Sequence, residues 1–526
     1  SNMIAENIAA LRKSRHLSQE KMADLFGVSR QAIQKWESGA ALPEVGKLID
    51  MAKMFGVSLD SLLCGSAATT DEIRFEKRIE PSYHALEDWE TYSCLLETEF
   101  TQCMEEGRDV QHLHGLLSEI SKLPNGKYKE AFADTAFSLL MHVPQRKGYA
   151  YYEPSDYEEI RRISRHSPAA AVKKDAALAD KIKGAWLGRV CGCLLGKPVE
   201  GMRLNELVPF LKETGNYPMH RYIHASDLTD ELCARYTFEL KGKCYPDVIP
   251  HAPSDDDTNY LVMANLLVRQ AGRAFTPTDV SKAWLALQSK NAYFTAERIA
   301  YRNFMNGFLP PESAWYKNPY REWIGAQIRG DYFGYINPGN PEAAAEMAFR
   351  DASISHVKNG IYGEMFVAAM LAKAAVCSDM EEIIRTGLSE IPESSRLFEQ
   401  VSRVLEAYLA GASFEETLQT CLYCRYDDQN GHHWCHTISN ALIVTAALLY
   451  GGGNFGKTVC LAVQSGFDTD CNGATAGSVL GMVIGGAAIP PEWARPVNGL
   501  LDSTIFGVET VSLDDMAEST LSHIPE

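Results

Sequence analysis

Apolar side chains recur at three- and four-residue spacing along most of the chain, and this spacing is typical of amphipathic helices. In the first 65 residues the pattern predicts five short helices separated by tight connections. Ser18 and Ser29 stand where helix N-caps belong, and Gly27 follows the second segment as a C-terminal cap. The five predicted helices span residues 4–13, 19–26, 30–37, 44–55 and 59–63.

The helical pattern continues to the end of the chain, with few of the two-residue alternations that predict strands. Residues 66–175 are acidic and predict a helical spacer or dimerisation region, with helices near 84–106, 109–122 and 128–141. The tyrosine-rich, acidic stretch 149–159 is expected to lie as a tether on the domain that follows. Residues 176–526 predict one large domain of many helices, so we expect an all-α protein.

Two glycine ladders in the large domain predict a close helix pair. Spacing of four places each ladder along one face of a helix. A glycine inside a helix costs about 0.5 to 1 kcal/mol relative to alanine, so close approach of two backbones is the simplest compensation. The first ladder is Gly184, Gly188, Gly192 and Gly196, and the second is Gly473, Gly477, Gly481 and Gly485.

Composition and targeting signals narrow the class of protein. With 46% hydrophobic and 22% charged residues, the chain is typical of soluble globular proteins. The longest apolar run, 473–489, is short for a membrane span and rich in glycine, so it predicts a buried core helix and no membrane partner. Thirteen scattered cysteines and no export signal predict a cytoplasmic protein with reduced thiols.

Charge distinguishes the first segment from the rest of the chain. The net charge of −18 would repel nucleic acid if it were spread evenly. Residues 1–65 hold eight Lys and Arg against seven Asp and Glu, whereas the remainder holds 42 against 61. A nucleic-acid partner is therefore compatible only with the first segment.

The short glycine-led turn between the second and third predicted helices is the geometry of a DNA-binding helix-turn-helix. The string SQEKMADLFGVSRQAIQKWESG, residues 18–39, resembles the lambda-repressor-like family along its whole length. The resemblance implies a five-helix DNA-binding domain at residues 1–65. It includes the apolar positions Met22, Ala23, Leu25, Val28, Ile33 and Trp36.

In such modules the start of the third helix enters the major groove. Arg30 and Gln31 are therefore the first candidates for base contacts, and Gln34 and Lys35 follow one turn later on the same side. Gln19 is placed for a phosphate. Binding to a palindromic site requires two modules, so we expect a homodimer.

Three separated acidic segments are candidates for chemistry: Glu200 in GCLLGKPVEG, Asp255, Asp256 and Asp257 in APSDDDTNY, and Asp468 with Asp470 in SGFDTDCNGATAG. The last two precede apolar helical runs, where one carboxylate can cap a helix. Capping needs a single carboxylate, whereas three consecutive aspartates repel one another. One or two hard cations such as Mg²⁺, bound by oxygen ligands, would relieve that repulsion.

The segment KGAWLGRVCGCLLGKPVEG, the run DDDT and GFDTDCNGATAG together resemble, in this order, the motifs of the ADP-ribosylglycohydrolase family. The resemblance implies a metal-dependent glycosidic hydrolase domain over 176–526, with Mg²⁺ (one or two ions, Mn²⁺ as a substitute) and an ADP-ribose-containing substrate or ligand. It implies the metal ligands Asp255, Asp256, Asp257, Asp468 and Asp470.

The same resemblance implies catalytic roles for Glu200, Asp256 and Asp470, with Glu200 as a general base or water-positioning group. The segments SISHVKNGIYGEMFVAAM and HTISNALIVTAALLYGGG resemble the helices that line the family's pocket. The substrate-binding residues implied by the resemblance are His356, Gly360, Tyr362 and Gly466. For His356, a plain hydrogen-bonded residue at a helix start is an equally good interpretation.

The sequence departs from the family pattern at two cysteines. Cys471 stands where many members have a ligating threonine, and Cys193 stands where an aspartate often occurs. A thiol is a poor ligand for Mg²⁺. The run CLYCRYDDQNGHHWCH, residues 421–436, has a zinc-like composition but irregular spacing.

Two functions therefore remain open. One is a hydrolase tethered to a DNA-binding module. The alternative is a non-catalytic transcription regulator that senses ADP-ribose or a related nucleotide-sugar through the same domain.

Overall fold

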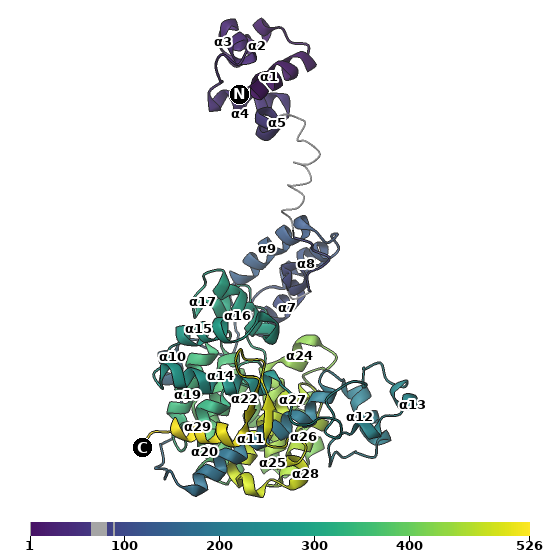
Figure 1. Cartoon of the computed structure of the whole chain (residues 1–526), viewed down its shortest axis with the longest axis vertical. Coiled ribbons are helices and arrows are strands. Elements are labelled where there is room, and N and C mark those ends of the chain that lie inside the picture. Colours follow the sequence, from purple (N-terminus) through teal and green to yellow (C-terminus); the bar gives the residue numbers. More distant parts are fainter. Residues whose placement is uncertain (1, 65–80, 88–89) are drawn as a thin grey trace. The chain divides into compact units, whose positions relative to one another are not determined.

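The computed structural model describes residues 2–64, 81–87 and 90–526. The chain divides into two compact units, residues 1–87 with 124–128 and residues 88–123 with 129–526. In both units nearly all of the regular secondary structure among the described residues is helical, which confirms the predicted all-α class (Figure 1).

The small unit contains the five predicted helices. The first helix begins two residues earlier and ends one residue later than predicted. The fourth helix begins one residue later, and the fifth ends one residue later. The helices are α1 (Asn2–Ser14), α2 (Gln19–Phe26), α3 (Arg30–Glu37), α4 (Val45–Phe55) and α5 (Leu59–Cys64).

Local caps define the turn between α2 and α3. The Ser18 hydroxyl accepts a hydrogen bond from the Lys21 N–H, and the Ser29 hydroxyl accepts one from the Ala32 N–H. Gly27 has φ +59°, the left-handed conformation that ends α2. Leu25, one of the apolar positions of the motif, is about half exposed, whereas its neighbour Phe26 is buried.

The spacer forms four helices that differ from prediction in where they begin. Residues 81–87 form turns, so the first spacer helix is shorter than expected, and part of its predicted range lies outside the described residues. The helices are α7 (Tyr92–Glu105), α8 (His114–Ser121), preceded by the 3-10 helix η2 (Gln111–Leu113), α9 (Lys127–Met141) and α10 (Tyr157–Ile163).

The spacer packs onto the large domain. Apolar side chains of α7, α8 and α9 share one core with Ile299, Tyr320, Trp323 and Cys435. The tether is anchored as expected, since the buried Glu153 pairs with Arg396 at 2.9 Å.

The remaining residues form the large domain. Its α-helices are α11 (Ala176–Gly196), α12 (Leu204–Glu213), α13 (Asp230–Cys233), α14 (Asp256–Ala271), α15 (Pro277–Leu287), α16 (Thr295–Met305), α17 (Glu312–Trp315), α18 (Asp331–Tyr335), α19 (Pro341–Ala352), α20 (Asn359–Ala374), α21 (Met380–Ser389), α22 (Arg396–Leu409), α23 (Phe414–Leu418), α24 (Gly431–Cys435), α25 (Thr437–Tyr450), α26 (Phe455–Gln464), α27 (Thr469–Ile484), α28 (Pro491–Ala494) and α29 (Leu513–Ser522). Shorter turns are η3 (Lys197–Val199), η4 (Ala225–Asp227), η5 (Lys290–Ala292), η7 (Gly486–Ala488) and the π-helix η6 (Gln419–Tyr423).

The two glycine ladders pack α11 directly against α27, as predicted. A Cβ added to Gly192 would overlap the carbonyl oxygen of Gly473, and Gly188 and Gly184 meet Gly477 and Gly481 in the same way. At the end of the ladder the Thr469 hydroxyl donates to the Gly196 carbonyl at 2.9 Å. This backbone contact fixes the C-terminal end of α11 beside the N-terminal end of α27.

A small two-stranded sheet contacts the segment that precedes α14. Strand β1 (Leu500–Asp502) pairs antiparallel with β2 (Thr510–Ser512), with Leu501 opposite Val511. Ala252 bridges to β1, because its N–H donates to Leu500 and its carbonyl accepts from Asp502. The sheet thereby holds the segment that leads into α14.

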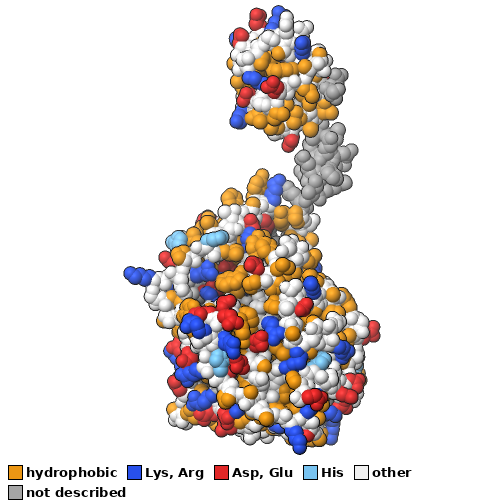
Figure 2. Space-filling view, turned by 90° about the vertical axis from the view of Figure 1, so that its left-hand side faces the viewer, with side chains coloured by type: hydrophobic (Ala, Val, Ile, Leu, Met, Phe, Trp, Pro, Cys, Tyr) orange, Lys and Arg blue, Asp and Glu red, His pale blue; other side chains and the backbone are white. Residues whose placement is uncertain are grey.

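The core of the large unit is built mainly from apolar side chains, and its surface is mixed in charge. Helices α20 and α25 are buried on nearly all sides. In the described part of the chain, no helix combines the length and apolarity needed to cross a bilayer. Acidic and basic side chains are interspersed over the face of the large unit shown in Figure 2.

Candidate functional site

The acidic residues predicted from three separated segments meet in the large domain. Glu200 follows α11, Asp257 lies in the first turn of α14, and Asp468 and Asp470 open α27. One carboxylate oxygen from each of Glu200, Asp468 and Asp470 lies within 4.8 Å of the other two. Asp470 also lies within that distance of Asp257 in a second group, completed by the thiol of Cys471. Carboxylates from all three segments therefore lie close together.

Of the three consecutive aspartates, Asp255 acts as the helix cap. Its Oδ1 accepts from the Asp257 N–H at 2.9 Å, and its Oδ2 lies 2.5 Å from Lys197 Nζ. Burial is the largest influence and works against its charged form, but the Lys197 charge and the hydrogen bonds to Asp255 together lower the pKa of Asp255. Both Asp255 oxygens are thus engaged by the protein itself.

Asp257 points inward and is only partly paired. Its Oδ1 lies 3.3 Å from Arg189, whose guanidinium also binds Asp331 at 2.9 Å. Its Oδ2 has no hydrogen-bond partner among the residues that the structure describes, although the side chain is fully buried. Burying a carboxylate oxygen without a partner is costly, so this atom is the first sign of an absent ligand.

The turn before α27 places Asp468 by an unusual backbone conformation. Gly466 and Phe467 both have positive φ, +77° and +60°. This conformation is uncommon for phenylalanine, and the buried ring is held by stacking on Tyr423. The Asp468 N–H donates to Asn440 Oδ1, while Asp468 Oδ1, like Asp257 Oδ2, lacks a partner in the described residues.

The cluster carries more negative charge than its own cations neutralise. The three acidic segments contribute six carboxylates, and the cations paired with them are Lys197 and Arg189. The six are Glu200, Asp255, Asp256, Asp257, Asp468 and Asp470. Burial, and then the charge of Asp470, raises the pKa of Asp257 well above its usual range. Glu200 is exposed, and its pKa is raised chiefly by the charge of Asp470. The two partnerless oxygens and the excess charge fit a divalent cation with oxygen ligands.

A cavity of about 570 Å³ opens beside the cluster. This volume is within the range of small-molecule sites. Glu200, Asp256 and Asp468 line it on the acidic side. Its other lining residues are Lys197, Ser254, Asp255, Asn259, Ser289, Asn291, Ala292, Phe294, Thr295, Glu297, Trp323, Ile324, Gly325, Ile328, Trp434, Cys435, Cys471 and Thr504.

Sequence reasoning missed the aromatic walls of this cavity. Phe294, Trp323 and Trp434 come from segments far apart in the chain, and no local pattern marks them. Lys197 could have been noticed, because it lies three residues before Glu200 in the same motif.

The four predicted substrate-binding residues do not line this cavity. His356 is fully buried and its Nδ1 pairs with Ser355 Oγ at 2.7 Å. Tyr362 is buried and its hydroxyl donates to the Pro154 carbonyl of the tether. Gly360 packs against the Arg321 carbonyl, and Gly466 packs against a leucine side chain. In the structure these four residues therefore contribute to packing and to the shape of loops.

The zinc-like run contributes two histidines to another cluster. His432, His436 and Glu105 each offer a ligand atom within 4.8 Å of the others. However, His432 Nδ1 accepts from the Trp323 indole N–H and His436 Nδ1 accepts from the Ile438 N–H. An indole N–H and a backbone N–H can only donate, so the Nδ1 atom of each histidine accepts and carries no proton. Each neutral ring therefore carries its proton on Nε2, which faces Glu105. Metal-bound histidines instead donate from the second nitrogen, so this tautomer argues against zinc.

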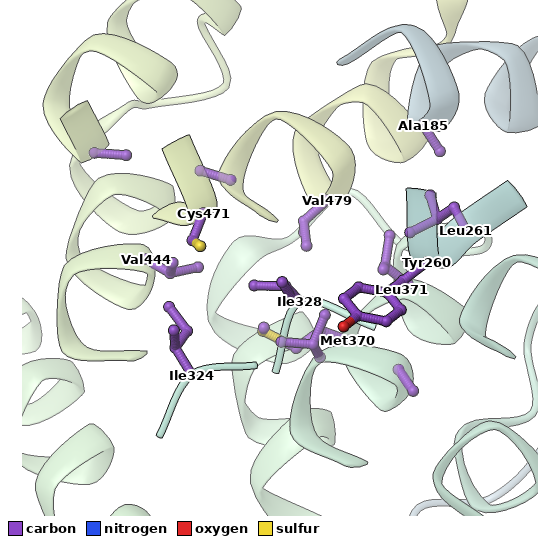
Figure 3. Close-up of a cluster of buried hydrophobic side chains, with 14 of the residues drawn as sticks. Ala185, Tyr260, Leu261, Ile324, Ile328, Met370, Leu371, Val444, Cys471 and Val479 are labelled. Carbon is purple, nitrogen blue, oxygen red and sulfur yellow. The ribbon is translucent and has the colours of Figure 1, made fainter. Parts of the chain in front are cut away.

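Cys471 forms the boundary between the acidic site and the apolar core. Figure 3 shows it at the edge of a buried cluster with Val444, Ile324 and Ile328. Its sulfur is also within 4.8 Å of ligand atoms of Asp257 and Asp470. The thiol therefore contacts both environments.

The predicted DNA-reading side chains lie on the exposed face of α3. Arg30, Gln31, Gln34 and Lys35 are all exposed, whereas the buried face of this helix is formed by Ile33 and Trp36. Gln19, which we expected to contact a phosphate, donates to Glu37 Oε2 at 2.8 Å.

Comparison with known proteins gives two family matches. The family model described as ADP-ribosylglycohydrolase matches residues 174–523, and the one described as helix-turn-helix matches residues 8–62. A solved structure described as an ADP-ribosylglycohydrolase-related protein complex is 19% identical, with a TM-score of 0.41. The match covers 66% of this chain and 97% of that one.

Curated relatives resemble only part of the chain. The HTH-type transcriptional activator BcrR of Enterococcus faecalis is 42% identical over 65 residues, 12% of this chain and 32% of that protein. The SPbeta prophage-derived uncharacterized HTH-type transcriptional regulator YonR of Bacillus subtilis (strain 168) is 39% identical over 69 residues, 13% of this chain and 64% of that protein. The chain thus spans about a third to two thirds of the length of these relatives.

Proposed function

This chain belongs to the ADP-ribosylglycohydrolase family, and from that premise we propose that it is a DNA-binding hydrolase that cleaves the glycosidic bond of an ADP-ribosyl group or a related ribosyl nucleotide. The observation that carries the proposal is the meeting of Glu200, Asp468 and Asp470 within 4.8 Å, at the wall of a cavity of about 570 Å³. The aromatic side chains on the other walls suit a nucleotide base.

The reaction requires a proton acceptor and negative charge beside the sugar. Cleavage at the anomeric carbon of a ribose builds positive charge on the ring, which nearby carboxylates stabilise. Glu200 is the exposed carboxylate of the group, so its Oε accepts the proton of the attacking water. Asp256 lines the cavity beside it, and Asp470 sets the charge that Glu200 experiences.

The donor set suits one or two divalent cations, Mg²⁺ or Mn²⁺. Asp257, Asp468 and Asp470 would hold them, because Asp257 Oδ2 and Asp468 Oδ1 have no hydrogen-bond partner among the described residues. A bound cation supplies orientation of the ribose hydroxyls and a lower pKa for water.

The helix-turn-helix domain gives the hydrolase a DNA target. Arg30 and Gln31 are exposed at the start of α3 and can pair with guanine and adenine edges. The curated relatives are named as transcription regulators, so we place the DNA contact at an operator. Two copies of the module on a palindromic site make a homodimer part of the proposal.

A second candidate is a regulator that senses a nucleotide-sugar without cleaving it. One observation favours it. Trp323 and Cys435 line the cavity and also belong to the core that the spacer helices share. A ligand that contacts these side chains would therefore act directly on the packing of α7, α8 and α9.

Turnover distinguishes the two candidates. The full chain is incubated with substrates ADP-ribosylated on arginine or serine, with Mg²⁺ or EDTA, and released ADP-ribose is measured. The hydrolase predicts release that requires the cation and is lost in Glu200→Gln. Asp230→Asn, which changes an exposed carboxylate that does not line the cavity, should leave the release unaffected. Binding of ADP-ribose without release from any substrate would favour the regulator.

A further inference from the structure

The two metal positions of the acidic site differ in donor chemistry. The first, formed by Asp468 and Asp470 beside Glu200, offers only oxygen atoms. The second, formed by Asp257, Asp470 and Cys471, offers two carboxylates and a thiol. Asp470 belongs to both. A ligand atom of each residue in a group lies within 4.8 Å of the others, which is close enough for one ion to reach all three.

We propose that the position formed by Asp257, Asp470 and Cys471 binds a thiol-accepting divalent cation of the zinc type, while the all-oxygen position binds a hard cation. The inference rests on the metal-binding part of the proposed function. Mg²⁺ selects carboxylate, carbonyl and water oxygens, whereas Zn²⁺ binds thiolate sulfur together with carboxylate oxygen.

An orphaned atom at this position supports the assignment independently of the cysteine. Asp257 Oδ2 is buried without a hydrogen-bond partner in the described residues, while its Oδ1 is directed at Arg189. The remaining oxygen therefore needs a positive partner. Cys471 is 5% exposed and a carboxylate oxygen of Asp257 lies within 4.8 Å of its sulfur, so an ion between them would lose little to competing water.

Asp255 does not compete for this ion. Its two oxygens already accept from Lys197 and from the Asp257 N–H. Cys193 lies within 4.8 Å of Asp255 and Asp257, at the edge of the same position. Cys471 is the better candidate, because both of its carboxylate neighbours belong to the acidic site rather than to the helix cap.

Cobalt reports on this position directly, because a cobalt–thiolate bond gives a charge-transfer absorption that oxygen ligands do not. The metal-free full chain, kept in a thiol-free reductant, is titrated with Co²⁺. We expect this absorption in the wild type and its loss in Cys471→Ser. Cys191→Ser is the matched control, because Cys191 is a buried thiol of α11 that donates to the Trp493 carbonyl. It should keep the absorption.

Competition then tests the preference. Zn²⁺ should displace the cobalt signal at a free concentration at least about tenfold lower than Mg²⁺ does. Cys471→Ser should retain Mg²⁺ binding at the all-oxygen position by calorimetry, which shows that the variant is folded.

Three results would overturn the proposal: no thiolate absorption in the wild type, an absorption that survives in Cys471→Ser but is lost in Cys193→Ser, or equal displacement by Mg²⁺ and Zn²⁺. The readout is independent of turnover. An absorption without hydrolysis therefore counts against the proposed function alone, and hydrolysis without the absorption counts against this inference alone.

Discussion

At the scale of single residues, each aspartate of the run 255–257 has a different task. Asp255 caps α14 and pairs with Lys197, and Asp256 lines the cavity. Asp257 is buried, and one of its oxygens has no hydrogen-bond partner in the part of the chain that the structure describes. From the sequence we expect one carboxylate to cap the helix, and we expect the repulsion among the three aspartates to require a neutralising cation. The sequence does not show which aspartate has which role, because their partners Lys197 and Arg189 lie 58 and 68 residues away in the chain.

Asp468 is expected to be essential for cation binding. Asp468→Ala removes one member of the all-oxygen group and the buried oxygen that lacks a partner. We expect Mn²⁺ affinity to fall at least about tenfold and hydrolysis to be lost. DNA binding by the small unit should be unchanged. Mn²⁺ binding by calorimetry and an operator-binding assay check both halves, and unaltered turnover would mean that this motif only starts α27.

Arg203 is a further candidate for ligand binding. Its guanidinium lies 4.5 Å from the ring centre of Trp434, which lines the cavity. Its Nη1 is buried without a partner among the described residues. We expect Arg203→Ala to weaken ADP-ribose binding by about 1.5 to 3 kcal/mol, because a diphosphate favours a positive partner. Arg235→Ala, at an exposed arginine, is the control for calorimetry. Equal affinities of the two variants would exclude the contact.

At the scale of elements, the glycine ladders hold the site together. The Cβ of Gly192→Ala would overlap the backbone of α27, which has no flexible atoms to move. We expect a loss of about 1 to 3 kcal/mol in stability and weaker cation binding, since the ends of α11 and α27 would separate. Gly115→Ala is the matched control, because this helical glycine in α8 has open space at its Cβ. Thermal unfolding of the large unit compares them, and equal midpoints would contradict the packing argument.

Features that depend on neighbouring residues could be predicted from the sequence. Features that depend on contacts between residues far apart in the chain could not. The caps Ser18, Gly27 and Ser29 act within four residues, so α2 and α3 were predicted with their observed bounds. The ladders on α11 and α27 were visible because they repeat. Docking of the spacer was not, because it depends on contacts such as that of Gln102 with Glu322, 220 residues apart.

Because the cavity and the spacer core share side chains, a ligand in the cavity is expected to affect the spacer helices. Trp323 touches the cavity and the core of α7 to α9. We therefore expect ADP-ribose to slow amide hydrogen exchange in α7. Helix α13, which contributes no residue to the cavity lining, serves as the internal control. An identical exchange pattern with and without ADP-ribose would remove the basis for the regulator.

At the scale of the whole molecule, two separately folded units imply two separable activities. The side chain of Arg30 is exposed on α3 of the small unit. Arg30→Ala should cost roughly 1 to 3 kcal/mol on the preferred DNA site and relax base preference at one position. Lys53→Ala, at an exposed lysine on α4, controls for loss of charge. Selection from a random DNA pool measures both, and an equal loss on every sequence would show that Arg30 contacts only phosphate.

The central claim is that the acidic cavity binds an ADP-ribosyl group beside bound cations. A crystal of the full chain soaked with ADP-ribose and Mn²⁺ tests this most directly, because manganese is located by its anomalous scattering. The account predicts ADP-ribose in the cavity, its terminal ribose beside Glu200, and manganese bound by Asp468 and Asp470. An empty cavity, or ADP-ribose bound away from these carboxylates, would contradict it.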